Sequence, residues 1–247
     1  MKFARARNPK SDKIFEGEII EENRLKTDTR SLDLSRLNLL APVEPSKIVC
    51  VGLNYRDHVE ETNSQIPDNP SLFFKPPTAV IDPGESIEIE KENRYDPEAE
   101  IAVVIGSNCR NVDREDAFNY VWGFTGLNDV TNREAQSWEQ NWVRAKGFDT
   151  SAPLGPVIVT PDEIDLPISF SLKVNGRERQ SSDTSNLIFG FRQLIEEISS
   201  FMTLERGDVI STGTPRGVAP ITGGDTVRLD IEGIGVLENH VQYREKN

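Results

Sequence analysis

The sequence predicts a β-rich mixed α/β fold with few helices, preceded by a small N-terminal β module. Short segments rich in β-branched residues recur along the chain and are separated by glycine and proline, as in sheet proteins. Segments with helical periodicity are fewer. The composition changes after Ala41–Lys47 (APVEPSK), a segment with two prolines that we interpret as a linker. We therefore expect a module over residues 1–45 and a main domain over residues 46–247.

The strands are expected in the following order. In the polar N-terminal part, the alternating stretch Lys13–Ile20 predicts a strand or hairpin arm. After the linker, apolar and β-branched runs predict further strands at Ile48–Leu53, Ser71–Phe74, Ile87–Glu90, Ala99–Ile105, Tyr120–Val130, Val157–Thr160, Ser169–Val174, Asp208–Thr212, Asp225–Ile231 and Gly235–Val241.

Three helices are expected in the main domain. The first covers Arg56–Thr62, with Asn54 as a potential N-cap. The second is a short helix over Arg114–Asn119. The third and best supported covers Phe189–Phe201, where apolar residues recur at helical spacing.

Charge and hydropathy exclude two classes of partner. The formal net charge is −13 and the pI is near 4.7, whereas nucleic-acid binding needs a basic face. No apolar run approaches the length of about 20 residues that a membrane-spanning helix needs. The N-terminus is charged and lacks the apolar region of a secretory signal, so we expect a cytoplasmic protein. Cys50 and Cys109 form no spaced motif and are expected to be buried free thiols.

Two carboxylates stand at the start of a strand that is expected to be buried. Glu98 and Glu100 lead directly into the apolar run Ile101–Ile105. Residues two apart on a strand point to the same side, so both side chains should face one direction at the edge of the core. Like charges in a partly dry place repel unless a proton or a metal ion lies between them. The alternative is that the strand begins in solvent and both carboxylates are hydrated.

A third carboxylate, Asp129, closes the apolar segment YVWGFTGLNDV. Three carboxylates without a nearby His or Cys set suit a hard cation held by oxygen, Mg²⁺ first, with Mn²⁺ or Ca²⁺ as alternatives. Zinc does not fit, because His58 and His240 are the only histidines. Asp129 also has a structural alternative, in which it caps a helix over Thr131–Trp138.

The chain resembles the fumarylacetoacetate hydrolase family over residues 46–243. The segments that carry the resemblance are VGLNYRDHVEE, LFFKPPTAVI, YDPEAEIAVVIG, GFTGLNDVTNREAQ, AKGFDTSAPLGP, and GDVISTGTPRGV with the closing GGDTVRLDIEGIG. The resemblance implies the C-terminal-domain fold of that family, a mixed β-sheet roll with few helices that forms the catalytic domain. Residues 1–45 resemble the small β module that some members carry. A homodimer and a role in the catabolism of aromatic compounds are also implied.

The resemblance also implies roles for single residues. Glu98 and Glu100 match the E-x-E metal pair of the family, and Asp129 matches its third carboxylate ligand. Lys146 matches the lysine beside the metal. From these matches we expect the three carboxylates to bind Mg²⁺.

Further matches lie around this site. His58 and Glu61 match a His–Glu pair found in hydrolytic and decarboxylating members. Positions that line or support the substrate pocket are matched by Arg133, Gln136, Thr150 and Thr214.

These residue types suit a small keto acid. A 2-oxo acid can chelate a metal ion through a carboxylate oxygen and its keto oxygen, and a Lewis acid then stabilises the enolate. Hydrolysis, decarboxylation and tautomerisation all pass through this enolate. His58 and Glu61 lie three apart on the expected helix, so the carboxylate can orient the imidazole as a base that activates water. The alternative is an incidental pair on a surface helix.

We therefore expect a divalent-metal-dependent hydrolase that cleaves a carbon–carbon bond of an acylpyruvate-type (2,4-dioxo acid) substrate and releases pyruvate. The enzymatic alternatives are an isomerase or decarboxylase of 2-hydroxyhepta-2,4-diene-1,7-dioate-type keto acids, an oxaloacetate decarboxylase, and a 2-keto-3-deoxy sugar-acid dehydratase. The alternative outside enzymes is a metal- or ligand-binding protein. Nucleic acid and membranes are not expected partners.

Overall fold

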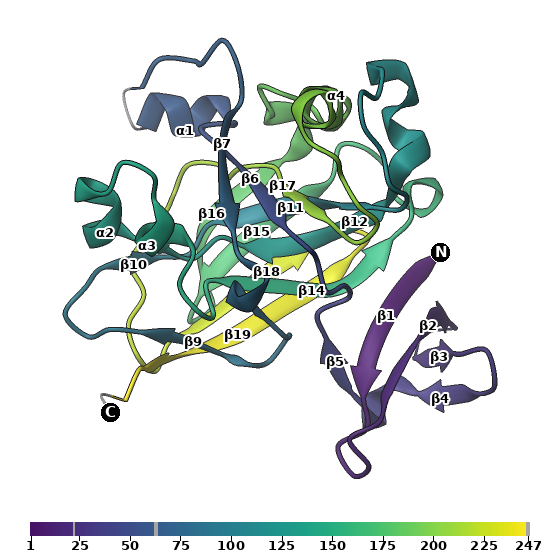
Figure 1. Ribbon diagram of the computed structural model, residues 1–247. Coiled ribbons are helices and arrows are strands. Elements are labelled where there is room, and N and C mark those ends of the chain that lie inside the picture. Colours follow the sequence, from purple (N-terminus) through teal and green to yellow (C-terminus); the bar gives the residue numbers. More distant parts are fainter. Residues whose placement is uncertain (22, 62–63, 246–247) are drawn as a thin grey trace.

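A large sheet forms the body of the protein in the computed structural model, which describes residues 1–21, 23–61 and 64–245 (Figure 1). Within these residues the sheet has twelve strands, and its main path runs β4-β3-β2-β1-β14-β12-β11-β17-β6-β7. Strand β5 pairs with β1, and β8 pairs with β14. The strands are β1 (Lys2–Arg7), β2 (Ile14–Ile20), β3 (Arg24–Lys26), β4 (Ser31–Asp33), β5 (Asn38–Leu40), β6 (Ile48–Gly52), β7 (Ser71–Lys75), β8 (Val80–Ile81), β11 (Ala99–Ile105), β12 (Val121–Asn128), β14 (Ala152–Val159) and β17 (Val209–Ser211).

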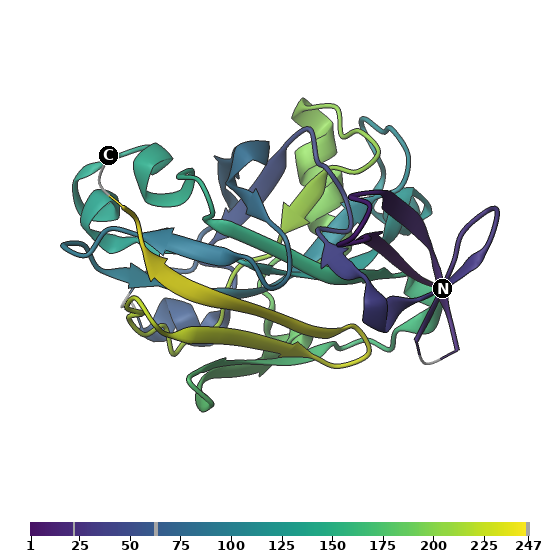
Figure 2. The same cartoon turned by 90° about the horizontal axis from the view of Figure 1, so that it is seen from below.

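A second, smaller sheet packs against the first. Its strand order in the described chain is β16-β15-β18-β19-β9. Figure 2 shows the yellow strands of this sheet as a layer along the teal strands of the large sheet. A two-stranded ribbon of β10 and β13 stands beside them. The bounds are β9 (Ser86–Ile89), β15 (Ser169–Val174), β16 (Arg177–Asp183), β18 (Thr226–Ile231), β19 (Gly235–Tyr243), β10 (Tyr95–Asp96) and β13 (Thr131–Asn132).

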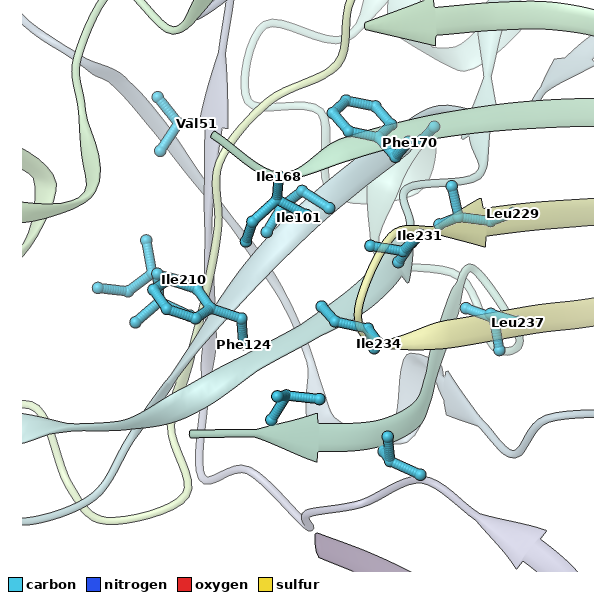
Figure 3. Packing of buried hydrophobic residues seen from close by; sticks show 14 of the residues in the cluster. Val51, Ile101, Phe124, Ile168, Phe170, Ile210, Leu229, Ile231, Ile234 and Leu237 are labelled. Atoms are coloured by element: carbon cyan, nitrogen blue, oxygen red, sulfur yellow. The ribbon is translucent and has the colours of Figure 1, made fainter. Parts of the chain in front are cut away.

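The main hydrophobic core lies between the two sheets. Ile101 and Phe124 from the large sheet face Phe170 and Leu229 from the small sheet (Figure 3). All seven residues of β11 are buried, which agrees with a strand covered on both faces. The predicted β-rich mixed fold is therefore confirmed.

Helices cover the margins of the sheets (Figure 1). The longest, α4, buries Leu194, Ile195 and Ile198 along one stripe, as its periodicity predicted. The helices are α1 (Arg56–Glu61), α2 (Arg133–Trp138), α3 (Val143–Lys146) and α4 (Phe191–Phe201), with 3₁₀ turns η1 (Leu34–Arg36), η2 (Pro77–Ala79), η3 (Arg114–Tyr120), η4 (Pro161–Glu163) and η5 (Thr184–Asn186). No helix of the described chain is long and apolar enough to cross a membrane.

The start of the first expected helix needs a correction. Asn54 does not cap α1, because its side-chain oxygen accepts a hydrogen bond from the Phe189 amide. Its side-chain nitrogen donates to the carbonyl oxygens of Phe189 and Thr212, so Asn54 joins distant loops. The end predicted at Thr62 lies outside the described residues.

The helix expected from Thr131 begins two residues later. Thr131–Asn132 pair instead with Tyr95–Asp96, and Asn132 caps α2 by accepting a hydrogen bond from the Ala135 amide. Asp129 is therefore not the cap of this helix.

Some elements were not expected from the sequence. They include the first strand β1, the charged strand β16 (RERQSSD) and the single-turn helix α3. The expected strand at Val157–Thr160 begins earlier, at Ala152, and the helix predicted at Arg114–Asn119 is the 3₁₀ turn η3. Polar composition hid β1 and β16 because both gain their order from pairing with neighbouring strands.

The N-terminal strands β1 to β5 continue the large sheet. β1 pairs with β2 on one side and with β14 on the other, with Phe3 opposite Ile158. One sheet thus runs through both parts of the chain (Figure 1). The division of the chain at residue 45 stays a prediction.

Candidate active site

Three buried carboxylates meet where β11 begins and β12 ends. The antiparallel register sets Ala99 opposite Asn128, which brings Glu98 next to Asp129. The Asp129 amide donates a hydrogen bond of 2.9 Å to the Glu98 carbonyl and holds the two backbones together. One carboxylate oxygen from each of Glu98, Glu100 and Asp129 lies within 4.8 Å of the others.

Two lysines from other segments neutralise this cluster. Lys146, at the end of α3, donates to Glu98 Oε2 and to Asp129 Oδ2, each at 2.7 Å. Lys75, at the end of β7, is 1% exposed, and its Nζ lies 2.8 Å from Asp129 Oδ1. The ammonium of Lys75 donates to three backbone carbonyls, those of Val130, Lys146 and Ser151.

Sequence reasoning did not select Lys75 as a site residue. A signal was present, because Lys75 has the same strand parity as the buried Phe73 in Ser71–Lys75. A lysine at a buried strand position needs paired acceptors, and here the carbonyls supply them.

The two glutamates have opposite protonation preferences. Burial and the charges of Asp129 and Glu98 raise the pKa of Glu100 to about 8. Burial also opposes the ionisation of Glu98, but Lys146 and Arg133 outweigh it and lower the pKa of Glu98 to about 2. Glu100 Oε2 accepts hydrogen bonds from Ser211 Oγ at 2.5 Å and from the Gly213 amide at 2.8 Å. In neutral solution the cluster therefore holds a proton on Glu100, where a cation can replace it.

The cluster fits a hard divalent cation. Asp129 Oδ1 is buried and lies 2.8 Å from the Lys75 ammonium, yet burial and the charges of Asp129 and Glu98 still raise the pKa of Glu100 to about 8. The two lysines therefore neutralise the cluster incompletely, and a divalent cation among the three carboxylates would supply the missing positive charge. Carboxylate oxygens alone are the donor set that Mg²⁺, Mn²⁺ and Ca²⁺ accept. Glu98, Glu100 and Asp129 are the residues that would hold the ion.

A small pocket opens over the three carboxylates. Its volume is about 60 Å³. Among the residues predicted for the site, the lining includes His58, Glu98, Glu100, Asp129, Arg133, Gln136, Lys146 and Thr214. A larger hollow of about 590 Å³, lined in part by Tyr95, Trp138 and Phe148, contains none of the predicted residues.

Two aromatic residues of the pocket lining were not predicted. Phe73 and Trp142 meet edge to face with ring centroids 5.6 Å apart, and both line the pocket. Lys146 Nζ lies 5.0 Å from the Phe73 ring centroid, within cation–π range. Trp142 has a left-handed backbone (φ 56°), a conformation that costs energy and often accompanies functional sites.

Arg133 and Gln136 act together on α2. They lie three residues apart on the helix, and Arg133 Nη1 donates to Gln136 Oε1 at 2.8 Å. Arg133 Nη2 donates to Glu98 Oε1 at 2.6 Å, and its Nε donates to Asp96 Oδ2 at 2.8 Å. The guanidinium therefore joins the carboxylate cluster to Gln136, which also lines the pocket. Asp96 was not selected from the sequence, although it stands two residues before Glu98 in YDPEAE.

His58 and Glu61 are in contact on α1. His58 Nδ1 lies 3.1 Å from Glu61 Oε2, and Glu61 Oε1 accepts a hydrogen bond of 3.0 Å from the Gly217 amide. The helix turn thus places His58 on the pocket and anchors Glu61 to the loop after β17.

The two threonines assigned by resemblance differ in position. Thr214 lines the pocket, donates to the Ala99 carbonyl at 3.0 Å and accepts from Gln180 Nε2 at 2.8 Å. Thr150 does not line it; its hydroxyl accepts a hydrogen bond of 2.9 Å from the Glu88 amide. The structure therefore directs the Thr150 hydroxyl to β9 instead of the expected pocket, because a positive φ turns the backbone there (φ 70°).

Comparison with known proteins agrees with this arrangement. The family profile described as Fumarylacetoacetate (FAA) hydrolase C-terminal matches residues 47–242. The chain belongs to the fumarylacetoacetate hydrolase family. An uncharacterized family protein from Archaeoglobus fulgidus is 48% identical over 92% of this chain and 91% of its own length. Oxaloacetate tautomerase YisK from Bacillus subtilis is 40% identical over 84% of this chain and 74% of its own length. The predicted family membership is thus confirmed.

Solved structures of the family share the whole fold. The 5-carboxymethyl-2-hydroxymuconate delta-isomerase from Mycobacterium smegmatis superposes with a TM-score of 0.92, at 40% identity, over 100% of both chains. The maleylpyruvate hydrolase from Sphingobium sp. SYK-6, solved with manganese(II) and pyruvate, gives a TM-score of 0.84 at 26% identity, over 99% of this chain and 100% of its own. These relatives thus include an isomerase, a tautomerase and a hydrolase, and the hydrolase was solved with a divalent metal ion.

Proposed function

We propose that the protein is a divalent-metal-dependent tautomerase that interconverts the keto and enol forms of a short dicarboxylic 2-oxo acid of the oxaloacetate type. The observation that carries the proposal is the pocket of about 60 Å³ in which His58, Arg133 and Lys146 converge on three carboxylates. A proton carrier beside an enolate-stabilising cluster is what tautomerisation needs. The tautomerase from Bacillus subtilis supports the same reaction.

The charges of the site favour an anionic substrate. With Glu100 protonated, three ionised carboxylates, Asp96, Glu98 and Asp129, are in contact with four cationic side chains, Lys75, Lys146, Arg133 and Arg94. A divalent cation that displaces the Glu100 proton leaves the cluster net positive, and it supplies Lewis-acid stabilisation for an enolate oxygen. Positive charge in a buried pocket attracts a carboxylate even though the protein as a whole is acidic.

His58 is suited to move the proton. Its Nδ1 faces Glu61 Oε2, so Nδ1 carries the hydrogen and Nε2 is the basic nitrogen. The keto form loses a proton from C3 to His58, and His58 returns a proton to the C2 oxygen to give the enol. The reaction gains and loses no atoms, so it requires no water in the pocket. Lys146, beside Glu98 and Asp129, contributes positive charge near the developing oxyanion.

Hydrolysis of an acylpyruvate is the second candidate. The His58–Glu61 contact also suits a base that activates water, and the maleylpyruvate hydrolase shares the fold. Hydrolysis adds two demands, a bound water and space for the acyl group. Two oxaloacetate tautomerases are 40% and 41% identical to this chain, against 26% for the maleylpyruvate hydrolase, so similarity favours tautomerisation over hydrolysis.

The test follows the enol of oxaloacetate by its ultraviolet absorbance in buffer with Mg²⁺ or Mn²⁺. We expect the protein to accelerate ketonisation and EDTA to abolish the effect. His58→Ala should slow the reaction, and His240→Ala is the matched control because His240 lies on β19 outside the pocket. Release of pyruvate from acetylpyruvate and from oxaloacetate measures hydrolysis and decarboxylation separately. Ketonisation no faster than in buffer with either metal would reject the proposal.

A further inference from the structure

The guanidinium of Arg133 has donors left over for a ligand. An arginine has five N–H groups in a fixed fork. Three are directed to Asp96, Gln136 and Glu98. Within the described chain this leaves one N–H on each terminal nitrogen. Two such donors are what a carboxylate needs for bidentate binding.

Asp96 is the most firmly held of the three acceptors. It is fully buried, and Arg94 binds it from the other side with two hydrogen bonds of 2.9 Å. The backbones are also joined, because the Arg133 amide donates to the Arg94 carbonyl at 2.8 Å and Asp96 pairs with Thr131. The ribbon of β10 and β13 therefore fixes both ends of the Asp96–Arg133 contact.

The other two acceptors, Glu98 and Gln136, are less suited to orient Arg133. Glu98 belongs to the proposed metal ligands, so its oxygens serve the cation. Gln136 is half-buried and neutral, and a neutral acceptor holds a guanidinium less strongly than a carboxylate does. Of these three acceptors, Asp96 alone is charged, fully buried and outside the cluster of the three proposed metal ligands.

We propose that Asp96 is a positioning residue that orients Arg133 so that its two remaining N–H groups bind the distal carboxylate of the substrate. The inference rests on the proposed function, because it assigns to Arg133 the second carboxylate of a dicarboxylic 2-oxo acid. Asp96 itself does not line the pocket and acts through Arg133. The pair would make the site selective for dicarboxylic over monocarboxylic keto acids.

Binding of two ligands, one with and one without the distal carboxylate, tests this role. The first, 3,3-difluoro-oxaloacetate, has the distal carboxylate but no hydrogen on C3, so it cannot enolise. The second, pyruvate, lacks the distal carboxylate. With Mg²⁺ present, calorimetry should show that Asp96→Asn weakens difluoro-oxaloacetate about tenfold and pyruvate less than about twofold. Asp230→Asn is the matched control, since it makes the same change in an aspartate that binds Arg228 on β18 away from the pocket, and it should change neither ligand by more than about twofold.

A double-variant cycle separates positioning from general damage. In an Arg133→Met background, Asp96→Asn should cause no further loss of difluoro-oxaloacetate, because its effect passes through Arg133. Asp96→Glu serves if Asp96→Asn does not fold; it keeps the charge, moves the carboxylate, and should weaken difluoro-oxaloacetate about threefold.

Three results would overturn the positioning role. They are equal weakening of both ligands, additive losses in the cycle, and wild-type protein that does not prefer difluoro-oxaloacetate to pyruvate. A protein that shows the predicted binding but does not ketonise oxaloacetate would reject the proposed function and leave the role of Asp96 standing.

Discussion

Replacing Ser211 by alanine should make metal binding more sensitive to pH. Ser211 Oγ donates a buried hydrogen bond of 2.5 Å to Glu100 Oε2 and stabilises the ionised form of that carboxylate. A hydrogen bond to a charged group is worth about 1.5–3 kcal/mol, and one pKa unit corresponds to 1.36 kcal/mol. Its loss should therefore raise the pKa of Glu100 from about 8 by roughly one to two units.

The direction of the effect on metal binding follows from competition. Glu100 with a pKa of about 8 is about 90% protonated at pH 7, so a bound cation should release about 0.9 proton. In Ser211→Ala the proton is held more tightly, so the apparent metal Kd at pH 8 should rise about 5- to 50-fold. The difference between the two proteins should shrink as the pH rises, to about twofold or less at pH 10, because the proton then competes less with the metal ion.

Titration calorimetry with Mg²⁺ in buffers of different ionisation enthalpy measures both quantities. The wild type should release about 0.9 proton at pH 7 and about 0.5 at pH 8, whereas Ser211→Ala should stay close to one at pH 8. Ser199→Ala is the matched control, because Ser199 is a buried serine on α4 whose hydroxyl bonds to the backbone of Glu196 and Val112. Metal binding without proton release at pH 7, or identical Kd values at pH 8, would refute the assignment of the proton to Glu100.

Three further perturbations probe the same cluster. Glu98→Gln should abolish tight Mg²⁺ binding, as measured by calorimetry, while thermal unfolding followed by circular dichroism remains cooperative. Tight Mg²⁺ binding by this variant would contradict the role of Glu98 as a ligand. His58→Ala should lower the rate of tautomerisation by about 10²- to 10⁴-fold without changing metal affinity, because it removes the proton carrier only; an unchanged rate would exclude His58 as that carrier. Lys75→Met should destabilise the apoprotein by about 3–5 kcal/mol in urea unfolding, since three carbonyls and Asp129 lose a buried cation, and a loss below about 1 kcal/mol would contradict the importance of these contacts.

Glu98 and Glu100 show what the alternation of side chains along a strand can and cannot predict. Strand parity predicted that Glu98 and Glu100 point to one side of a buried strand, and both side chains are indeed buried. Parity could not predict that the two have opposite pKa shifts. That difference depends on Lys146 and Arg133 beside Glu98, whereas the hydrogen-bond partners of the Glu100 carboxylate in the described part of the chain, Ser211 and Gly213, are uncharged.

Two polar residues show why other expectations failed. Asn54 stands where a helix cap is normal, yet its amide joins loops 135 and 158 residues away in the sequence. Thr150 sits in a segment that matches the family, yet its own backbone conformation turns the hydroxyl to β9. In both cases a distant partner decided where a short polar side chain bonds.

The sequence by itself determined the β-rich fold, the family and the identity of the three carboxylates. The alternation of side chains along a strand and the order of the family segments can both be read directly from the chain. Tertiary structure decided what those carboxylates can do. The register of β11 with β12 brings Asp129 to Glu98, and β7 and α3 add the cations of Lys75 and Lys146. Electrostatic energies depend on distance and burial, which no stretch of sequence contains, so the proton on Glu100 and the orientation of Arg133 appear only in the folded protein.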